Sequence, residues 1–355
     1  MKEISAMKYK IFAFAVICFV LLNGATTGVA QTKANNQTNQ QTIQLASLLP
    51  ASDAVVTLDL QKLLNEAAPQ VLSGKPQMLG EINAKIDELR EKTGLDARQF
   101  EQIAIGVAMK QITAREVDLE PVFLARGKYN ANALIAVAKL ASKGKYREEK
   151  IGARTVYVFS GKDIVEQNKP QTKNSWFDQA IERMIKGLSK EIAVTPFDGN
   201  TLAFGSIERL RATFEGKTRV SNQVLSLVNR KPNAVVSFGA NLPAGLSSFI
   251  DLENDELGKT LDSIRQMSGA VEARDGNVGV SLTAKTLKAE QAQGLHETLE
   301  GLQMLGKTLL GGKSADRQVY SRMIDNARFT RNLTEVSLDL QVPQTDINIL
   351  LAGVK

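Results

Sequence analysis

Two similar apolar runs occur in the chain, AVVTLDL at residues 54–60 and AVVSFGA at residues 234–240. Each run follows a proline-containing turn, LLPASD before the first and NRKPN before the second. Apolar, β-branched residues bounded by turn formers are typical of a buried strand. A helical pattern follows each run, so we expect one strand–helix unit to occur twice, about half the chain length apart.

The helical pattern is clearest after the first run. Met78, Ile82, Ile86 and Leu89 recur at steps of three and four residues, which places them on one face of a helix. Gly94 follows at the position where a left-handed helix cap is favoured. A comparable apolar stripe follows the second run.

Further apolar segments predict that more strands complete each unit. Asp-Gly pairs at 198–199 and 275–276 indicate tight hairpins. Tight hairpins join antiparallel strands, whereas parallel strands need long crossover connections. The predicted fold class is therefore α+β, with two tandem related units, each an antiparallel sheet with helices packed on one face.

The chain is too long for one compact core, which favours two units. We expect a signal peptide at residues 1–30 and a flexible leader rich in Gln, Asn and Thr at 31–48. The first α+β unit is expected at 49–228 and the second at 229–355. The first is the longer one, chiefly through an insertion at 160–190.

The first thirty residues have the layout of a secretory signal. Lys2, Lys8 and Lys10 form a positive segment, residues 11–22 are apolar, and residues 28–30 are small ones that suit a signal peptidase. We expect cleavage near Ala30 and a secreted or periplasmic protein with no transmembrane span in the mature chain. The alternative is an uncleaved anchor, but a membrane span needs roughly 20 apolar residues.

Cysteine usage agrees with export to a bacterial envelope. Cys18 is the single cysteine and lies inside the expected signal peptide. The mature chain would then contain no disulfide and no cysteine-based metal site.

The charge pattern excludes nucleic acid from the expected partners. The formal net charge is +6, and aromatic residues make up 5% of the chain. Proteins that bind nucleic acids usually combine a dense basic stripe with aromatic stacking platforms, and the sequence has neither.

No combination of residues in the sequence predicts catalysis. His296 is the single histidine, and HETLE lacks the second histidine of a zinc-binding helix. The acidic run at 251–256 lacks the glycine and glutamate of a calcium-binding loop. The sequence Gly312-Lys313-Ser314 lacks the earlier glycine of a phosphate-binding loop. We expect no catalytic residue, no metal and no cofactor, with His296 on the flank of a helix.

The strongest candidate for a binding element is the amphipathic segment 176–190 within the insertion. Its apolar side chains gain about 1.5–3 kcal/mol each on burial, so they can pack on the sheet of their own unit or against a partner or membrane surface. Packing within the protein is favoured, and a binding role is kept as the alternative. The candidate ligand or partner contacts are Trp176, Phe177, Ile181, Met184 and Ile185.

The opening of the first unit also carries a family resemblance. LLPASDAVVTLDLQKLL, residues 48–64, resembles a broad group of exported bacterial proteins of unknown function, which begin the mature domain with a Leu-Pro-x-x-Ala-type turn, a strand and a Leu-rich helix. The shared motif is structural, so the resemblance implies an exported protein of this general fold and assigns no functional residue.

We therefore expect an exported, non-enzymatic protein that binds an unknown protein partner or a lipid-like ligand. Two alternatives remain open. One is a hydrolase whose paired carboxylates meet only in three dimensions, and the other is a purely structural component of the envelope.

Overall fold

The computed structural model describes residues 44–94, 96–113, 116–160, 191–243, 255–310 and 314–352. The elements of the first half are β1 (Ala54–Asp59), α3 (Leu60–Lys62), the π-helix η1 (Leu63–Ala67), α4 (Ala68–Val71), α5 (Pro76–Thr93), the 3-10 helix η2 (Ala97–Gln99), β2 (Phe100–Thr113), β3 (Glu116–Gly127), α6 (Ala131–Ala141), β4 (Tyr146–Ile151), β5 (Arg154–Ser160), β6 (Glu191–Asp198), β7 (Thr201–Gly205), α9 (Ile207–Glu215) and α10 (Asn222–Val228). Those of the second half are β8 (Val236–Asn241), α11 (Asp255–Asp262), β9 (Ile264–Arg274), β10 (Asn277–Thr286), α12 (Ala289–Leu310), α13 (Ala315–Asn326), β11 (Arg328–Asn332), β12 (Glu335–Val342) and α14 (Gln344–Ala352).

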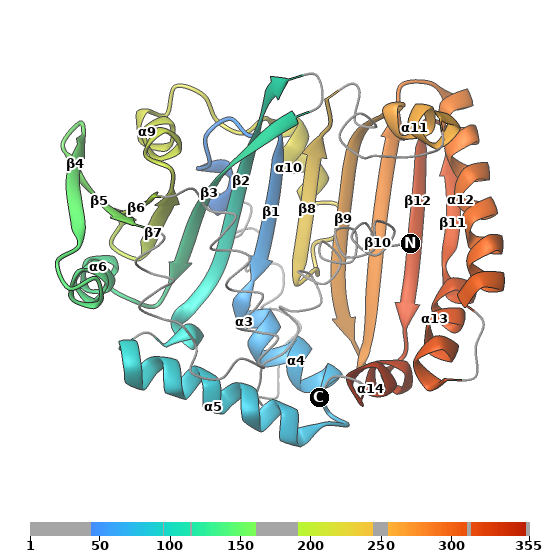
Figure 1. Ribbon diagram of the computed structural model, residues 1–355, viewed down its shortest axis with the longest axis horizontal. Helices are drawn as coiled ribbons and strands as arrows, with labels where there is room; N and C mark the ends of the chain where they lie inside the picture. The colour runs from blue at the N-terminus through green and yellow to red at the C-terminus, as the bar shows by residue number, and fades with distance from the viewer. Residues whose placement is uncertain are drawn as a thin grey trace.

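The strands form one continuous sheet (Figure 1). Among the described residues it has 12 strands, in the order β11-β12-β10-β9-β8-β1-β2-β3-β7-β6-β5-β4. Each neighbouring pair is antiparallel. The predicted α+β class with antiparallel strands is confirmed, but helices pack on both faces of the sheet and not on one face as predicted. The sequence did not predict that the sheets of the two units join edge to edge.

The two sheets meet where β1 pairs with β8, which are the two AVV runs themselves. In this pairing Thr57 lies opposite Ser237. These two residues also occupy the same position in the two runs, AVVTLDL and AVVSFGA. The related strands therefore lie across an approximate two-fold axis, which passes between Thr57 and Ser237.

The strand order is the same on both sides of this seam. Outward from it, the first half has β1, β2, β3, β7 and β6, and the second half has β8, β9, β10, β12 and β11. The first half then adds β5 and the edge strand β4. The repeated order fits the two tandem units predicted from the sequence, although low sequence similarity hides it outside the first strand of each half.

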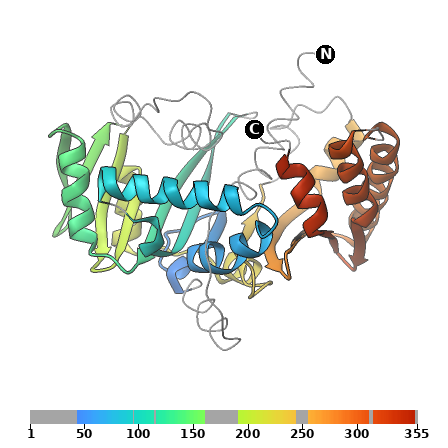
Figure 2. The ribbon, with the colours of Figure 1, turned by 90° about the horizontal axis from the view of Figure 1, so that it is seen from below.

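Two hydrophobic clusters occupy opposite faces of the sheet near the seam. The front face, which carries Leu58 and Val236, packs against η1, α4 and α14 in a cluster that contains residues of both halves. The back face, which carries Val55, packs against α9 and α10. Figure 2 shows helices on both sides of the sheet. Because the front cluster crosses the seam, the two halves share a core.

Several local sequence signals are confirmed. Gly94 caps α5 with a φ of 70° in the left-handed region. Asp275 and Gly276 join β9 to β10 with φ values of 52° and 78°, as a tight hairpin of this type requires. In the part of the chain that the structure describes, no helix has the length and apolar character needed to cross a membrane.

Candidate binding surface

The five contacts predicted from the sequence, Trp176, Phe177, Ile181, Met184 and Ile185, lie outside the described residues. Their role stays a prediction, and the candidate surface is built from other side chains.

His296 lies on α12 beside the apolar stripe of that helix. Its Nδ1 is 3.5 Å from Glu300 Oε2, one helical turn away, and its side chain is 21% exposed. Among the described residues, no group of three or more histidine, cysteine or acidic side chains is placed to hold a metal ion. This geometry places a carboxylate of the same helix beside the imidazole of His296.

Two buried carboxylates have structural partners. Asp59 caps the start of α3 by accepting a 2.8 Å hydrogen bond from the backbone N–H of Lys62, and its burial raises its pKa above the ordinary value. Asp346 accepts hydrogen bonds of 2.5 and 3.0 Å from Arg322, which joins α14 to α13. These contacts tie helices to the fold and leave each carboxylate committed to a nearby donor.

A row of apolar side chains crosses the front face on the central strands. Val56 pairs with Ile105, Ile105 with Phe123, and Phe123 with Phe204. Paired residues in a sheet point to the same face. We call this row, together with the residues that extend it along β2 and β3, the front band; it comprises Val56, Ile105, Val107, Met109, Leu119, Phe123 and Phe204.

The front band is rigid at one end and exposed at the other. The rings of Phe123 and Phe204 stack with centroids 4.5 Å apart and planes 4° apart. Leu119 is paired with Met109 and remains 56% exposed. Within the described residues, only Val56 of the front band packs against one of the hydrophobic clusters. Phe123 is buried and the other members apart from Leu119 are half-buried. The band is therefore an apolar row outside the helix-covered clusters that becomes exposed only toward Leu119.

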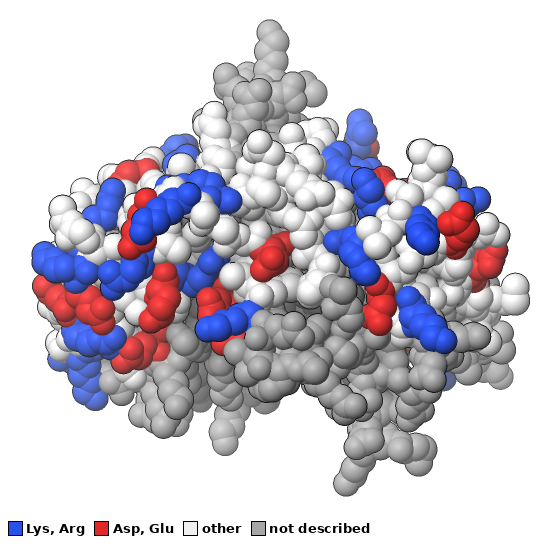
Figure 3. All heavy atoms as spheres, turned by 90° about the horizontal axis from the view of Figure 1, so that it is seen from above, with Lys and Arg blue, Asp and Glu red and all other residues white. Residues whose placement is uncertain are grey.

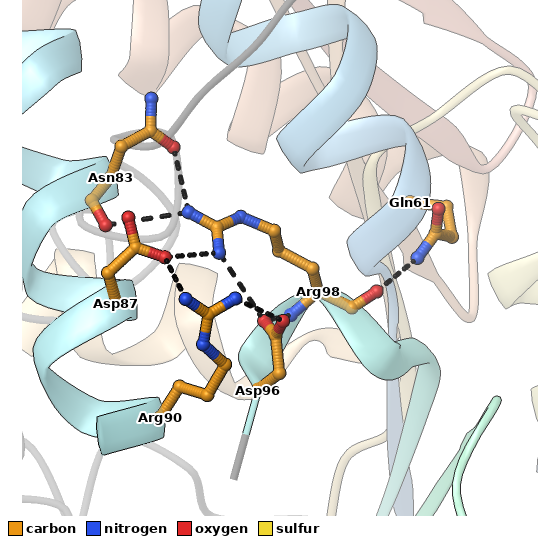
Figure 4. Close-up of polar contacts among 6 residues, drawn as sticks. All are labelled: Gln61, Asn83, Asp87, Arg90, Asp96 and Arg98. Carbon is orange, nitrogen blue, oxygen red and sulfur yellow. Dashed lines mark hydrogen bonds and ion pairs between the residues drawn. The ribbon is translucent and has the colours of Figure 1, made fainter. Parts of the chain in front are cut away.

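Helix α5 borders the front face along the lower edge in Figure 1, and a polar network fixes it there (Figure 4). Arg98, in η2, donates to Asp87 Oδ1 at 2.8 Å and to the backbone carbonyl of Asn83 at 3.4 Å. Asp96 accepts a 3.0 Å bond from the Arg98 backbone N–H, and Gln61 donates to the Arg98 carbonyl at 2.9 Å. One arginine thus joins α5, η2 and α3.

The charges of this network stabilise one another. The Arg98 guanidinium, through its hydrogen bond, lowers the pKa of the Asp87 carboxyl. Arg90 lies 3.5 Å from Asp87 and 3.8 Å from Asp96, so two cations face two anions. The network holds the lower border of the front face in place without adding net charge to it.

Charged side chains are unevenly spread over the top of the molecule. In Figure 3 they gather toward the two ends, whereas the middle is largely uncharged. The uncharged region lies over the middle of the sheet.

A small hollow lies on the back face beside the end of α10. It has a volume of about 70 Å³ and is lined by Leu227, Val228, Arg230, Lys231, Ser268, Gly269, Ala270, Ser281 and Thr283. An apolar cavity of about 150 Å³ binds a ligand the size of benzene, so this smaller hollow admits little more than ordered water. Its size makes it a weaker candidate than the front band.

The sequence analysis recognised the strands that carry the front band but did not select its residues. Ile103, Ile105, Val107 and Met109 alternate with residues that point to the other face of β2. This period of two is the signal that could have marked an apolar row. What it could not show is that helices leave part of the row outside the cores.

Comparisons with known proteins show only distant similarity. No family model matches the chain, and no curated protein matches it. Among solved structures, crystal form III of TP0453 is similar with a TM-score of 0.41 and 9% identity, covering 87% of this chain and 97% of that one. Crystal form IV of TP0453 gives 0.42 and 8%, covering 89% of this chain and 99% of that one.

Proposed function

We propose that this is an exported bacterial envelope protein, without enzymatic activity, that binds an apolar segment of a partner protein on the front band. The observation that carries the proposal is the apolar row on β1, β2, β3 and β7, which ends at the exposed Leu119. The signal-like N-terminus and the resemblance of residues 48–64 to exported proteins support the location.

Burial supplies the driving force for such binding. A leucine side chain gains about 1.5–3 kcal/mol when it passes from full exposure to full burial. Leu119 is 56% exposed, so a partner that covers it recovers roughly half of that, on the order of 1 kcal/mol. The half-buried side chains beside it add smaller gains on a surface that is already ordered, which keeps the entropic cost of binding low.

Site-specific photo-crosslinking in intact cells tests the proposal. A photoreactive phenylalanine analogue replaces Leu119 in one variant and Leu333 in a control. Leu333 is 75% exposed in the β11–β12 hairpin, far along the sheet from the front band. Binding on the front band predicts a protein adduct at position 119 and none at 333.

Three other results would count against the proposal. Equal adducts at both positions would indicate nonspecific contact, and an adduct at neither would leave the front band without a partner. A crosslink from position 119 to lipid alone would replace the protein partner by a lipid-like ligand. The expected export is checked separately, because the mature envelope protein should begin at Gln31.

A further inference from the structure

Strands β2 and β3 project beyond their neighbours as a two-stranded arm (Figure 1). They pair with each other as far as Thr113 opposite Glu116. By contrast, β1 pairs with β2 only up to Val107, and β7 pairs with β3 only from Val122. Within the described chain, the arm past these points has no strand on either side.

Hydrogen bonds to Asp53 show which way the main chain of the arm points. The Asp53 N–H donates to the Val107 carbonyl at 2.9 Å, and the Met109 N–H donates to Asp53 Oδ2 at 2.7 Å. The main-chain groups of Val107 and Met109 therefore point toward β1. Their partners across the arm, Pro121 and Leu119, then form the non-hydrogen-bonded pairs of the ladder and point away from β2.

The two edges of the arm are consequently different. On the edge beside β1, Asp53 forms hydrogen bonds with the Val107 carbonyl and the Met109 N–H. The outer edge presents the N–H and C=O of Leu119, for which the described chain offers no strand partner. Proline is tolerated on an edge strand where its missing N–H faces outward, and Pro121 satisfies that condition.

We infer that the outer edge of β3 at Leu119 receives an extended strand of a partner protein. This strand pairs with the Leu119 main chain and lays its apolar side chains beside Leu119 and Met109. Strand addition of this kind draws affinity from main-chain hydrogen bonds and specificity from alternate side chains. The inference rests on the proposed function, because it gives the form of the partner segment that the front band binds.

Charge at the edge selects the composition of the strand. Asp118 and Glu120 flank Leu119 and point to the opposite face of β3. Asp118 is exposed, and Lys110 lies across the arm, 4.0 Å from Glu120 and 66% exposed. Lys110 and Arg209 both act on Glu120, whereas Asp118 has no ion-pair partner among the described residues. The fitting strand therefore places a basic residue beside Asp118 among its apolar ones.

The same charges argue against a second copy of this chain as the occupant. An antiparallel pairing of two β3 edges centred on Leu119 would place Asp118 of one copy opposite Glu120 of the other, twice. Like charges directly opposite each other destabilise a strand pair. A heterologous basic strand avoids this repulsion and uses the same hydrogen bonds.

The test uses a blocked peptide of alternating valine and lysine and follows the backbone amides of the full mature protein by NMR. Binding should slow hydrogen exchange of the Leu119 amide. Leu119→Pro removes the outward N–H without removing a bond to β2, and Leu119→Ala is its matched control. Loss of one main-chain hydrogen bond costs about 0.5–1.5 kcal/mol, so Leu119→Pro should weaken binding roughly two- to tenfold. Leu119→Ala should weaken it less than Leu119→Pro does.

Three outcomes would overturn the inference. They are absence of peptide binding, equal binding by the proline and alanine variants, and dimerisation of the protein through the arm in the absence of peptide. A peptide with the same residues in separate valine and lysine blocks should not protect the Leu119 amide. A further result separates the two proposals: the photoreactive variant at position 119 still crosslinks to a protein in cells, while Leu119→Pro binds the peptide as tightly as the wild type does. In that case the proposed function stands and the strand addition fails.

Discussion

Replacing Gly239 with alanine should destabilise the protein at the seam between its halves. Gly239 lies on β8 opposite Val55 of β1. An added Cβ would lie 2.6 Å from Leu227 Cβ and 2.9 Å from both the Val224 carbonyl oxygen and the Val228 nitrogen. Apolar atoms prefer separations of about 3.5–4.0 Å, so α10 would have to retreat by about 1 Å.

The cost follows from what α10 contributes to the core. Val224, Leu227 and Val228 are all at least 95% buried, and two of the blocking atoms belong to the helix backbone, which cannot move aside as a flexible side chain would. Overpacking of this kind typically costs about 1–3 kcal/mol. We expect the upper part of that range for Gly239→Ala.

Urea unfolding measures this cost as a lower midpoint with an unchanged slope. Gly80→Ala is the matched control, because Gly80 lies in α5 with nothing within 4 Å of an added Cβ. The control should gain about 0.5–1 kcal/mol from the higher helix propensity of alanine. A Gly239→Ala midpoint at or above that of the wild type would refute the close packing of α10 on β8.

Three further changes test other parts of the structure. Burial raises the pKa of Asp59 above 3.8, so the wild type should lose stability relative to Asp59→Asn as the pH rises from about 4 through the folded-state pKa. Urea unfolding of both proteins across that pH range measures the difference in their free energies of unfolding. A difference that does not change with pH would indicate a solvated carboxyl. Arg98 lowers the pKa of Asp87, so Asp87→Asn should be less stable than the wild type at pH 7. Unfolding of both proteins at decreasing pH should show this difference in stability vanish as the pH falls through the folded-state pKa of Asp87. A difference in stability that persists at low pH would contradict the ion pair. Gly301→Ala, in α12 with nothing within 4 Å of an added Cβ, should raise the melting temperature through a gain of about 0.5–1 kcal/mol, and a lower one would show that the helix is packed there.

Local sequence patterns identified the elements that depend on nearby residues. The AVV runs, the cap at Gly94 and the Asp-Gly hairpin at 275–276 all appear where the sequence placed them. Each of these depends on the conformational preference of a few adjacent residues. Helices α9 and α10 were not predicted, although Ser206 and Ser221 cap them through their side chains. Serine followed by a helical apolar pattern is a recognised start signal.

Local sequence patterns could not predict that the two halves join in one sheet, or which residues form the front band. β1 pairs with β8, although their residues are about 180 positions apart in the chain. The conformational preferences of neighbouring residues do not determine such a long-range pairing. The alternation along β2 indicates an apolar face. Which part of that face stays outside the cores depends on where α5, α6 and α12 pack. Side-chain exposure at Leu119 is likewise a property of the assembled sheet.

A disulfide across the seam tests the union of the two halves most directly. Ala54 lies opposite Ala240, beside the hydrogen bond from the Asn241 N–H to the Asp53 carbonyl. The alanine pair is thus a non-hydrogen-bonded one, with Cα atoms about 4.5 Å apart, within the range that a disulfide spans.

The measurement is the extent of intramolecular disulfide formation under mild oxidation of the folded protein. With Cys18 removed, Ala54→Cys/Ala240→Cys should oxidise nearly completely as a monomer. The control, Ala54→Cys/Ala270→Cys, should stay reduced, because Ala270 lies on β9 and points to the other face. Failure of the first pair to form a disulfide, or equal oxidation of both pairs, would contradict a single sheet built from two halves.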